Sequence, residues 1–488
     1  MRKLVRFFET SRDQWKAKCR SAKVKIKRLS SRGRAMKVSR DRWKKRAQEL
    51  ERELAAERAA RQKAEEEARS RPNSSAAITR PSSPAVAMNP RVPQHQYSLD
   101  CVFFFLSFLV SAALSLRGAS QVLALLCARQ PNTFARPSPW TGRLWLLRVG
   151  LFKLTRPKEL AADWVWIIDH TLQIGTTKCL LILGVRLSNL PTASTCLDHA
   201  AVEPLALIPV THSNRSVVAA QLEATVKVTG VPREIISDHG SDLKGGIELF
   251  QAAHPETIAI YDITHQTAAL LKRELEPDAI WLAFLEHVLS TRNRLQQTAL
   301  AAWRPPRLSS QARYMNVAPL VRWGGQALAA LDTPSRWANL AFDAATVETQ
   351  LGWLREYRQP LAEWTVLLEL VTTTERLVRQ EGLSVELPSK LAQQLPTALL
   401  TERVQAVRAE LLAFVTQEAA KAQPGERLLG STEVIESVFG RLKQVERTQA
   451  KNGFTGLILS VGALVAPMTE TVVQHALETI STAQVLEW

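Results

Sequence analysis

The sequence predicts an α/β core with a mixed five-stranded sheet, interrupted by a long all-helical insertion. Two observations indicate this fold class. Five apolar runs of strand length lie between residues 163 and 263, in the order β-β-β-α-β-α-β. Residues 264–425 then follow a helical pattern rich in Ala, Leu, Glu and Arg, and an amphipathic segment at 431–450 comes after them.

Each strand is expected from a short apolar run bounded by turn residues. The runs are DWVWIID at 163–169, CLLILGV at 179–185, PLALIPV at 204–210, EII at 234–236 and TIAIYDI at 257–263. Segment 213–230 is typical of a helix, because Ser213 or Asn214 can cap its start and Gly230 can end it. A short helix is expected near LKGGIELFQAA at 243–253.

The charge of the chain is concentrated at its start. The 488 residues contain 63 Lys and Arg against 46 Asp and Glu, a formal net charge of +17. Residues 1–49 alone hold 19 Lys and Arg against 4 Asp and Glu. Such a basic segment favours a polyanionic partner, nucleic acid first and an anionic membrane second.

The basic segment also has heptad spacing. Phe8, Trp15, Ala22, Leu29, Met36, Trp43 and Leu50 recur every seven residues, which predicts a coiled coil over 1–70 and a dimer formed through it. A solvated, charged tail is the alternative. Residues 71–97 contain five prolines and four serines and are expected to form a flexible linker.

Cysteine usage and hydropathy bear on the compartment. The five cysteines are scattered and form no CxxC pair, which argues against a disulfide framework or a zinc site and suits a reducing cytosol. The charged N-terminus does not resemble a secretory signal. The apolar segment 99–116 is shorter than the roughly 20 residues of a membrane span, so a buried helix is expected and a transmembrane helix is the alternative.

A pair of short helices is expected after this apolar segment. Residues 115–128 and 138–154 are separated by a turn-rich stretch, which resembles a helix-turn-helix. In that interpretation Thr141, Arg143 and Arg148 face DNA. The alternative is two ordinary core helices.

Two carboxylates stand at strand ends. Asp169 ends the first strand, and Asp238 ends the fourth, within the stretch SDHGSD. Asp238 alone has the ordinary interpretation of a turn residue. If the two strands are neighbours, however, the carboxylates converge, and a divalent cation such as Mg²⁺ is the usual reason for such an arrangement. A third carboxylate from a helix would complete a two-metal site.

The stretches WIIDHT and IISDHGSDL, with a late helical glutamate, resemble the Asp-Asp-Glu triad of DDE-type transposases and retroviral integrases, which have a ribonuclease H-like fold. The resemblance assigns Asp169 and Asp238 as the first two ligands. Glu436 is preferred to Glu433 as the third, because its distance in sequence from Lys443 matches the glutamate-to-lysine spacing of these enzymes.

The same resemblance extends to two further features. Lys443 would hold a DNA phosphate on the face of the helix that carries the glutamate. Asp262 and His265 resemble an Asp-x-x-His element that several transposase groups carry on the strand after the second aspartate, and they would position a nucleotide. By itself, His265 has the ordinary interpretation of a packed residue at a helix start.

The function implied by the resemblance is that of an insertion-sequence transposase. Two Mg²⁺ ions, with Mn²⁺ as a substitute, would support cleavage of transposon ends and transfer of the 3′-hydroxyl to target DNA. A homodimer or higher oligomer, no membrane association, and a cytoplasmic, nucleoid-associated prokaryotic location are expected. The alternatives are a catalytically silent DNA-binding or regulatory protein and a membrane-associated protein.

The expected domain organisation combines these inferences. Its parts are a basic coiled coil at 1–70, a linker at 71–97, a helix-turn-helix-like domain at 98–157, the first part of the core at 158–275, the helical insertion at 276–425, the second part of the core at 426–470 and a C-terminal tail at 471–488.

Overall fold

The computed structural model describes residues 91–93, 95–129, 135–174, 177–238, 240–307, 314, 317–333, 343–397, 401–446 and 455–488. The chain divides into two units, Met1–Ala87 and Met88–Trp488, and every described residue belongs to the second. The predicted coiled coil at 1–70 lies outside the described residues, as does most of the predicted linker.

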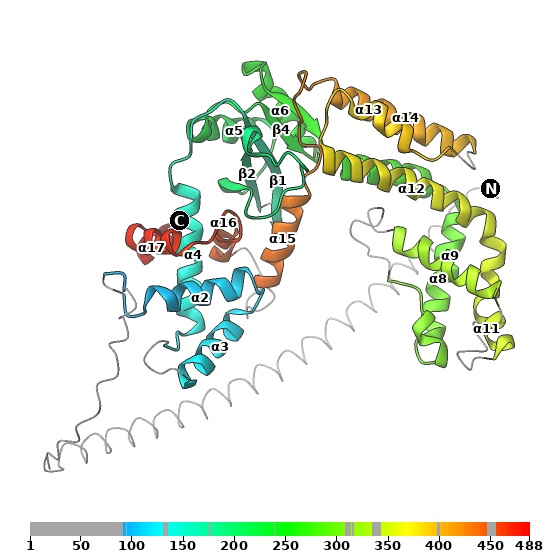
Figure 1. The fold of residues 1–488 in the computed structure, drawn as a ribbon, viewed down its shortest axis with the longest axis horizontal. Helices are drawn as coiled ribbons and strands as arrows, with labels where there is room; N and C mark the ends of the chain where they lie inside the picture. Colours follow the sequence, from blue (N-terminus) through cyan, green and yellow to red (C-terminus); the bar gives the residue numbers. More distant parts are fainter. Residues whose placement is uncertain are drawn as a thin grey trace, which may run out of the picture. The chain divides into compact units, whose positions relative to one another are not determined.

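The centre of the second unit is a mixed five-stranded sheet with the order β3-β2-β1-β4-β5 (Figure 1). Strands β1 to β3 form an antiparallel meander, β4 is parallel to β1, and β5 is parallel to β4. The strands are β1 (Trp164–Ile174), β2 (Thr177–Arg186), β3 (Glu203–Val210), β4 (Glu234–Ser237) and β5 (Ile258–Tyr261). The predicted α/β class with a mixed sheet is confirmed.

Both faces of the sheet are covered, as the apolar strands require. Trp166 and Ile168 of β1 pack against α5 (Arg215–Thr229) and α6 (Ser241–Ala253). Val165 and Ile167 belong to the main core on the opposite face. Successive side chains of a strand point to opposite faces, so one run of apolar residues serves both layers. As predicted, Asn214 caps α5, accepting hydrogen bonds from two backbone amides, and Gly230 ends it with φ at +86°.

A bundle of helices surrounds α4 (Pro139–Thr155), which lies mostly buried. It contacts α2 (Leu99–Val110), α3 (Leu116–Arg129), α16 (Ser460–Leu464), α17 (Glu470–Thr479) and α18 (Thr482–Glu487). This packing corrects one prediction, because residues 471–488 form packed helices rather than a tail. Residues 138–154 form a helix as expected, and the helix-turn-helix interpretation stays a prediction.

The end of the predicted linker is also part of this bundle. Val92 is buried, Tyr97 packs edge-to-face on Trp145, and a backbone bridge joins Arg91 to Ser98. These contacts correct the linker boundary, because residues near 91–97 have apolar partners that proline and serine content does not reveal. In α2, Phe105 and Leu106 have no exposed surface. No helix in the described ranges is both long and apolar enough to span a membrane.

Contact between α4 and the C-terminal segment requires glycine. A methyl group at Gly150 would lie 2.1 Å from the Leu459 carbonyl oxygen, and one at Gly462 would lie 2.4 Å from the Gly150 carbonyl oxygen. Both obstacles are backbone atoms, so neither can move aside as a flexible side chain can. Only glycine at both positions allows the two segments to approach this closely.

We expect Gly150→Ala to lower the free energy of unfolding by about 3 kcal/mol, because the added methyl must push the two backbones apart. Chemical denaturation of the full chain measures the loss. Gly325→Ala is the matched control: no atom lies within 4 Å of its new methyl group, and alanine is the better helix former. Equal stability of the two variants would contradict the close approach.

Between β5 and the late helix α15 (Glu433–Glu446), the chain forms a succession of helices, here called the helical region (263–419). Its aromatic core includes Trp281, Phe284 and Trp364, with ring centroids 4.8–5.7 Å apart, so these tryptophans are packing residues. The helices are α7 (Ile263–Leu275), α8 (Ala279–Leu295), η2 (Ala299–Trp303), α9 (Ala318–Leu331), α11 (Ala344–Leu351), η4 (Gly352–Tyr357), α12 (Arg358–Glu381), α13 (Leu387–Gln394) and α14 (Glu402–Ala419).

Candidate active site

The parallel pairing of β1 with β4 brings two aspartates to the same part of the sheet. Ile167 lies opposite Ile236 in the register, and Asp169 and Asp238 each stand two residues further along. The strands run in the same direction, so equal steps keep the residues level with one another. The register therefore brings the two aspartates to the same level of the sheet, as the sequence predicts for neighbouring strands. The prediction that Asp169 ends the first strand is wrong, because β1 continues to Ile174 in its pairing with β2.

Each aspartate uses one carboxylate oxygen in a local hydrogen bond. The amide of His170 donates to Asp169 Oδ1 over 2.6 Å, and the amide of Gly240 donates to Asp238 Oδ1 over 2.9 Å. Within the described residues the second oxygen of each accepts no hydrogen bond. His239, between Asp238 and Gly240, lies outside those residues. One oxygen of each carboxylate is thus left for a ligand.

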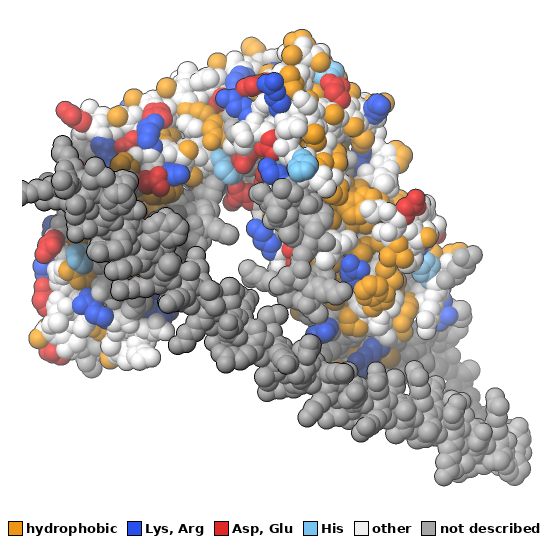
Figure 2. Space-filling view, turned by 180° about the vertical axis from the view of Figure 1, so that it is seen from behind, with side chains coloured by type: hydrophobic (Ala, Val, Ile, Leu, Met, Phe, Trp, Pro, Cys, Tyr) orange, Lys and Arg blue, Asp and Glu red, His pale blue; other side chains and the backbone are white. Residues whose placement is uncertain are grey.

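The electrostatic environment of Asp169 shows how closely the acidic groups gather. Burial raises its pKa to about 7, and the charge of Asp238 acts in the same direction, as does that of Glu436. The His170 amide and the charge of His265 oppose the shift. Burial is the larger cause and carboxylate repulsion the smaller, and a bound cation would offset both by favouring the charged form. Figure 2 shows acidic and histidine side chains gathered near the centre of one face.

Helix α15 supplies the third carboxylate. Its buried residues Ile435, Val438 and Leu442 form one apolar face, and the helix contacts β1. Glu436 lies at the edge of that face, with its side chain 40% exposed. Burial raises its pKa, and the charge of His265 opposes the shift.

Glu433, the other glutamate considered, has a different environment. Its side chain is 60% exposed, and its Oε2 lies 3.4 Å from Nη1 of Arg379. The charge of Glu436 is among those that raise the pKa of Asp169, and helix α15 contacts β1. The structure therefore brings Glu436 to the two aspartates. Arg379 of α12, which also donates to the Thr264 hydroxyl, is a site neighbour that no sequence pattern indicated.

Asp262 lies beneath the site, fully buried, and it joins two parts of the chain. Its Oδ2 accepts from the backbone amide of His265 at 2.9 Å, which caps α7, and its Oδ1 accepts from the amide of Thr432 at 2.8 Å. The amide of Ile263 donates to the Gly430 carbonyl at 3.0 Å. Asp262 therefore holds the start of α7 to the segment that leads into α15. Strand β5 ends at Tyr261, so the prediction that this motif lies on a strand is wrong.

His265 lies between Asp262 and Glu436. Its Nδ1 is 2.7 Å from Asp262 Oδ2, and its Nε2 is 3.8 Å from Glu436 Oε1. Burial lowers the pKa of His265, but the hydrogen bond and charge of Asp262, with the charges of Glu436 and Asp238, raise it to about 9. The ring is therefore cationic at neutral pH and faces the carboxylate of Glu436.

The ligand atoms of Asp262, His265 and Glu436 lie within 4.8 Å of one another, a spacing that a metal ion could bridge. Both oxygens of Asp262 are already hydrogen-bonded, and its Oδ2 accepts twice from His265. Asp262 thus supports the histidine rather than offering a free ligand oxygen. This arrangement, a carboxylate orienting an imidazole that faces a ligand, is typical of residues around metal sites.

A second polar network surrounds Asp242, which lies in the first turn of α6. Its Oδ2 accepts from Lys178 Nζ at 2.9 Å and from the Ser213 hydroxyl at 2.6 Å, and Ser213 lies 3.2 Å from His170 Nε2. Burial opposes ionisation, but the hydrogen bonds from Ser213 and Lys178 lower the pKa of Asp242 to about 2. The network ties α6 to β2 and to the residue after Asp169.

The residues predicted to contact DNA have different environments in the structure. Lys443 is exposed on α15, and Thr141 and Arg143 lie at the start of α4, where Arg143 stacks on the exposed Trp140 at 5.1 Å. Arg148 instead donates to the Leu477 carbonyl of α17. The prediction that Arg148 contacts DNA is wrong, because α17 covers this side of α4, which the sequence spacing does not show.

Comparisons with known proteins leave the family open. No protein-family model matches the sequence, and no curated protein does. Among solved structures the chain is similar to a Drosophila P element transposase strand transfer complex, with 10% sequence identity, a TM-score of 0.37, and coverage of 81% of this chain and 96% of that one. A TM-score this low carries no argument about function, which has to rest on the geometry of the site.

Proposed function

We propose that this chain is a DNA transposase of the DDE type with a ribonuclease H-like core, and that Asp169, Asp238 and Glu436 are its catalytic residues. The observation that carries the proposal is the placement of Asp169 level with Asp238 on parallel strands, with α15 carrying Glu436 against β1. The strand order, an antiparallel meander extended by two parallel strands, is the order expected of that core.

The donor set fits Mg²⁺, with Mn²⁺ as a substitute. Carboxylate oxygens are hard ligands, and the raised pKa of Asp169 marks negative charge that the protein itself does not balance. Asp169 would be shared by two ions, with Asp238 and Glu436 each holding one. Bound metal supplies an activated oxygen nucleophile and stabilises the leaving oxygen of a phosphodiester.

The other site residues would hold this arrangement in place. Asp262 fixes the approach of α15, and His265 orients Glu436 through its Nε2 edge. Lys443, two turns beyond Glu436 on α15, is placed to contact a DNA phosphate. In this proposal the enzyme acts on transposon ends and target DNA and works as a dimer or higher oligomer.

A catalytically silent DNA-binding protein is the second candidate. It would share the fold and the basic residues and would have no need of the three carboxylates. The three carboxylates lie near one another although this costs electrostatic free energy, as the raised pKa of Asp169 indicates. A catalytic site would explain that cost, so the arrangement favours the enzyme.

The proposal predicts that Asp238→Ala reduces DNA cleavage by roughly a thousandfold or more, because a lost metal ligand removes several kcal/mol of transition-state stabilisation. The substrate is a supercoiled plasmid carrying the genomic DNA on both sides of the coding sequence, incubated with the full chain and Mg²⁺. Glu433→Gln is the matched control on α15 and should retain activity. Equal cleavage by wild type and Asp238→Ala would refute the triad, and DNA binding without cleavage by wild type would favour the silent protein.

A further inference from the structure

A long stretch of the helical region contains arginine as its only charged residue type. Between Glu286 and Asp332 the sequence has six arginines and no Lys, Asp or Glu. Acidic and basic residues are otherwise mixed throughout the helical region. A run of one sign, without any acidic residue to neutralise it, creates a local positive field.

Four of these arginines lie at the end of α8 or shortly after it in the chain. Arg292 and Arg294 are in its last turn, and Arg304 and Arg307 follow η2. Arg292 donates to the carbonyl of Pro305, which holds the second pair against the helix. Burial lowers the pKa of Arg292, and so do the charges of Arg304 and Arg307, which therefore lie close to it.

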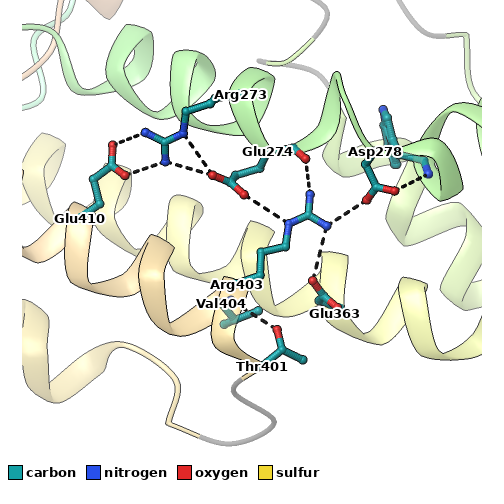
Figure 3. A network of polar contacts seen from close by, with 9 residues as sticks. Arg273, Glu274, Asp278, Glu363, Thr401, Arg403, Val404 and Glu410 are labelled. Carbon is teal, nitrogen blue, oxygen red and sulfur yellow. Dashed lines mark hydrogen bonds and ion pairs between the residues drawn. The ribbon is translucent and has the colours of Figure 1, made fainter.

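These arginines have no acidic partners, unlike others in the same region. Arg403 lies among Glu274, Asp278 and Glu363, and Arg273 pairs with Glu410 (Figure 3). Arg355 and Arg358 pair with Asp332. In the described part of the chain, no ion pair joins Arg292, Arg294, Arg304 or Arg307 to a carboxylate. Arg294, Arg304 and Arg307 are exposed, and we call these three the arginine surface.

Helix stability alone does not explain the arginine surface. Cations in the last turn of a helix interact favourably with its dipole, which accounts for Arg292 and Arg294. Arg304 and Arg307 lie beyond the helix and bring two more positive charges to the same place. Such a cluster raises the energy of the free protein, and an anion that bridges the guanidinium groups would lower it.

We propose that the arginine surface binds the phosphate backbone of duplex DNA. Guanidinium groups match phosphate oxygens in bidentate geometry, and a surface made of arginine alone suits that ligand better than a generally basic one. The choice of DNA as the polyanion rests on the proposed function. Backbone contacts carry no sequence information, so this surface would position DNA that the carboxylate site acts on.

The test is the triple variant Arg294→Gln/Arg304→Gln/Arg307→Gln in the full chain. Its matched control is Arg273→Gln/Arg355→Gln/Arg358→Gln, which removes the same charge from exposed arginines that already have acidic partners. Binding of a fluorescent 30-base-pair duplex is measured by anisotropy without Mg²⁺ over a range of NaCl concentrations, so that cleavage plays no part. Both proteins keep the basic N-terminal segment.

We expect the triple variant to bind at least about tenfold more weakly than the control at 0.1 M salt, and the slope of log K against log [salt] to fall by roughly 2 to 3, because each lost phosphate contact removes about 0.9 from the slope. The same affinity and slope in both proteins would overturn the inference and leave the proposed function standing. If wild type does not bind duplex DNA at all, both fail.

A second measurement locates the contact directly. Phenylglyoxal modifies accessible arginines, and mass spectrometry reports the extent at each position. With the duplex bound, Arg294, Arg304 and Arg307 should be protected at least about fivefold, while Arg273 and Arg358 should not. Unchanged modification of the arginine surface would overturn the inference even if the binding constants differed.

Discussion

Replacing Asp169 by asparagine will abolish DNA cleavage and, without metal, make the fold more stable. The carboxylate is held near two others, and its pKa is raised to about 7 from an ordinary value near 3.8. A shift of this size corresponds to about 4 kcal/mol of destabilisation above pH 7. Asparagine removes the charge but leaves a polar side chain buried. We therefore expect the free energy of unfolding to rise by only about 1–3 kcal/mol at pH 8.

The pH dependence distinguishes this cause from a packing effect. Between pH 4 and 7 the native state binds more protons at Asp169 than the unfolded state does, so the stability of the wild type falls as the pH rises through that range. The gain from Asp169→Asn should therefore shrink below pH 7 and vanish near pH 4. Chemical denaturation in EDTA measures it, and a gain independent of pH would contradict the electrostatic explanation.

Bound metal should make the wild type more stable than Asp169→Asn, the reverse of their order without metal. Mg²⁺ that binds the native carboxylates stabilises the wild type by mass action, whereas the asparagine variant lacks one ligand. We expect millimolar Mg²⁺ to raise the melting temperature of the wild type and to leave that of Asp169→Asn unchanged. An equal rise in both would mean that Asp169 is not a ligand.

Asp262→Ala should be the most destabilising substitution at the site. It removes the cap of α7 and leaves the buried Thr432 amide without its acceptor, while the His265 ring loses its partner. Unsatisfied buried donors and a lost cap together cost about 3–4 kcal/mol. Cleavage should fall as well, because the segment leading to Glu436 is released. Denaturation and cleavage assays on the same samples measure both effects.

His265→Gln separates orientation from stability. It keeps the backbone hydrogen bonds to Asp262 and removes only the imidazole. We expect stability to stay within about 1 kcal/mol of wild type and cleavage to fall by about 10–100-fold, as is typical when a residue orienting a metal ligand is lost. Wild-type cleavage by this variant would show that His265 does not orient Glu436.

The sheet and its aspartates were predictable because they depend on local patterns. Five apolar runs of strand length specify five strands. Asp238 directly follows β4 as expected, whereas β1 continues to Ile174, so Asp169 lies within β1 rather than at its end. Placing Asp169 next to Asp238 needed only the assumption that β1 and β4 are neighbours. The choice of Glu436 over Glu433 came from the resemblance to transposases, and it stays a prediction; in the structure Glu433 lies beside Arg379.

Other features depend on partners that are distant in sequence. A heptad count or a turn signal cannot show that residues 139–155 are enclosed by helices more than 300 positions later. Arginine is a common DNA-contacting residue type, but Nη2 of Arg148 donates to the Leu477 carbonyl of α17. Lys153, a charged residue in the same helix, is fully buried and donates to the Val465 and Ala466 carbonyls.

The sequence by itself determined the strands and placed an aspartate in the first strand and another after the fourth, because short-range periodicity and turn chemistry act within a few residues of each position. Only the tertiary structure decided what surrounds them. The sequence pattern places Asp262 on the fifth strand, whereas in the structure its side chain caps α7 and accepts a hydrogen bond from the Thr432 amide, 170 positions away. Such contacts form when the segment that follows the helical region packs against the sheet. No local sequence pattern determines where that segment packs.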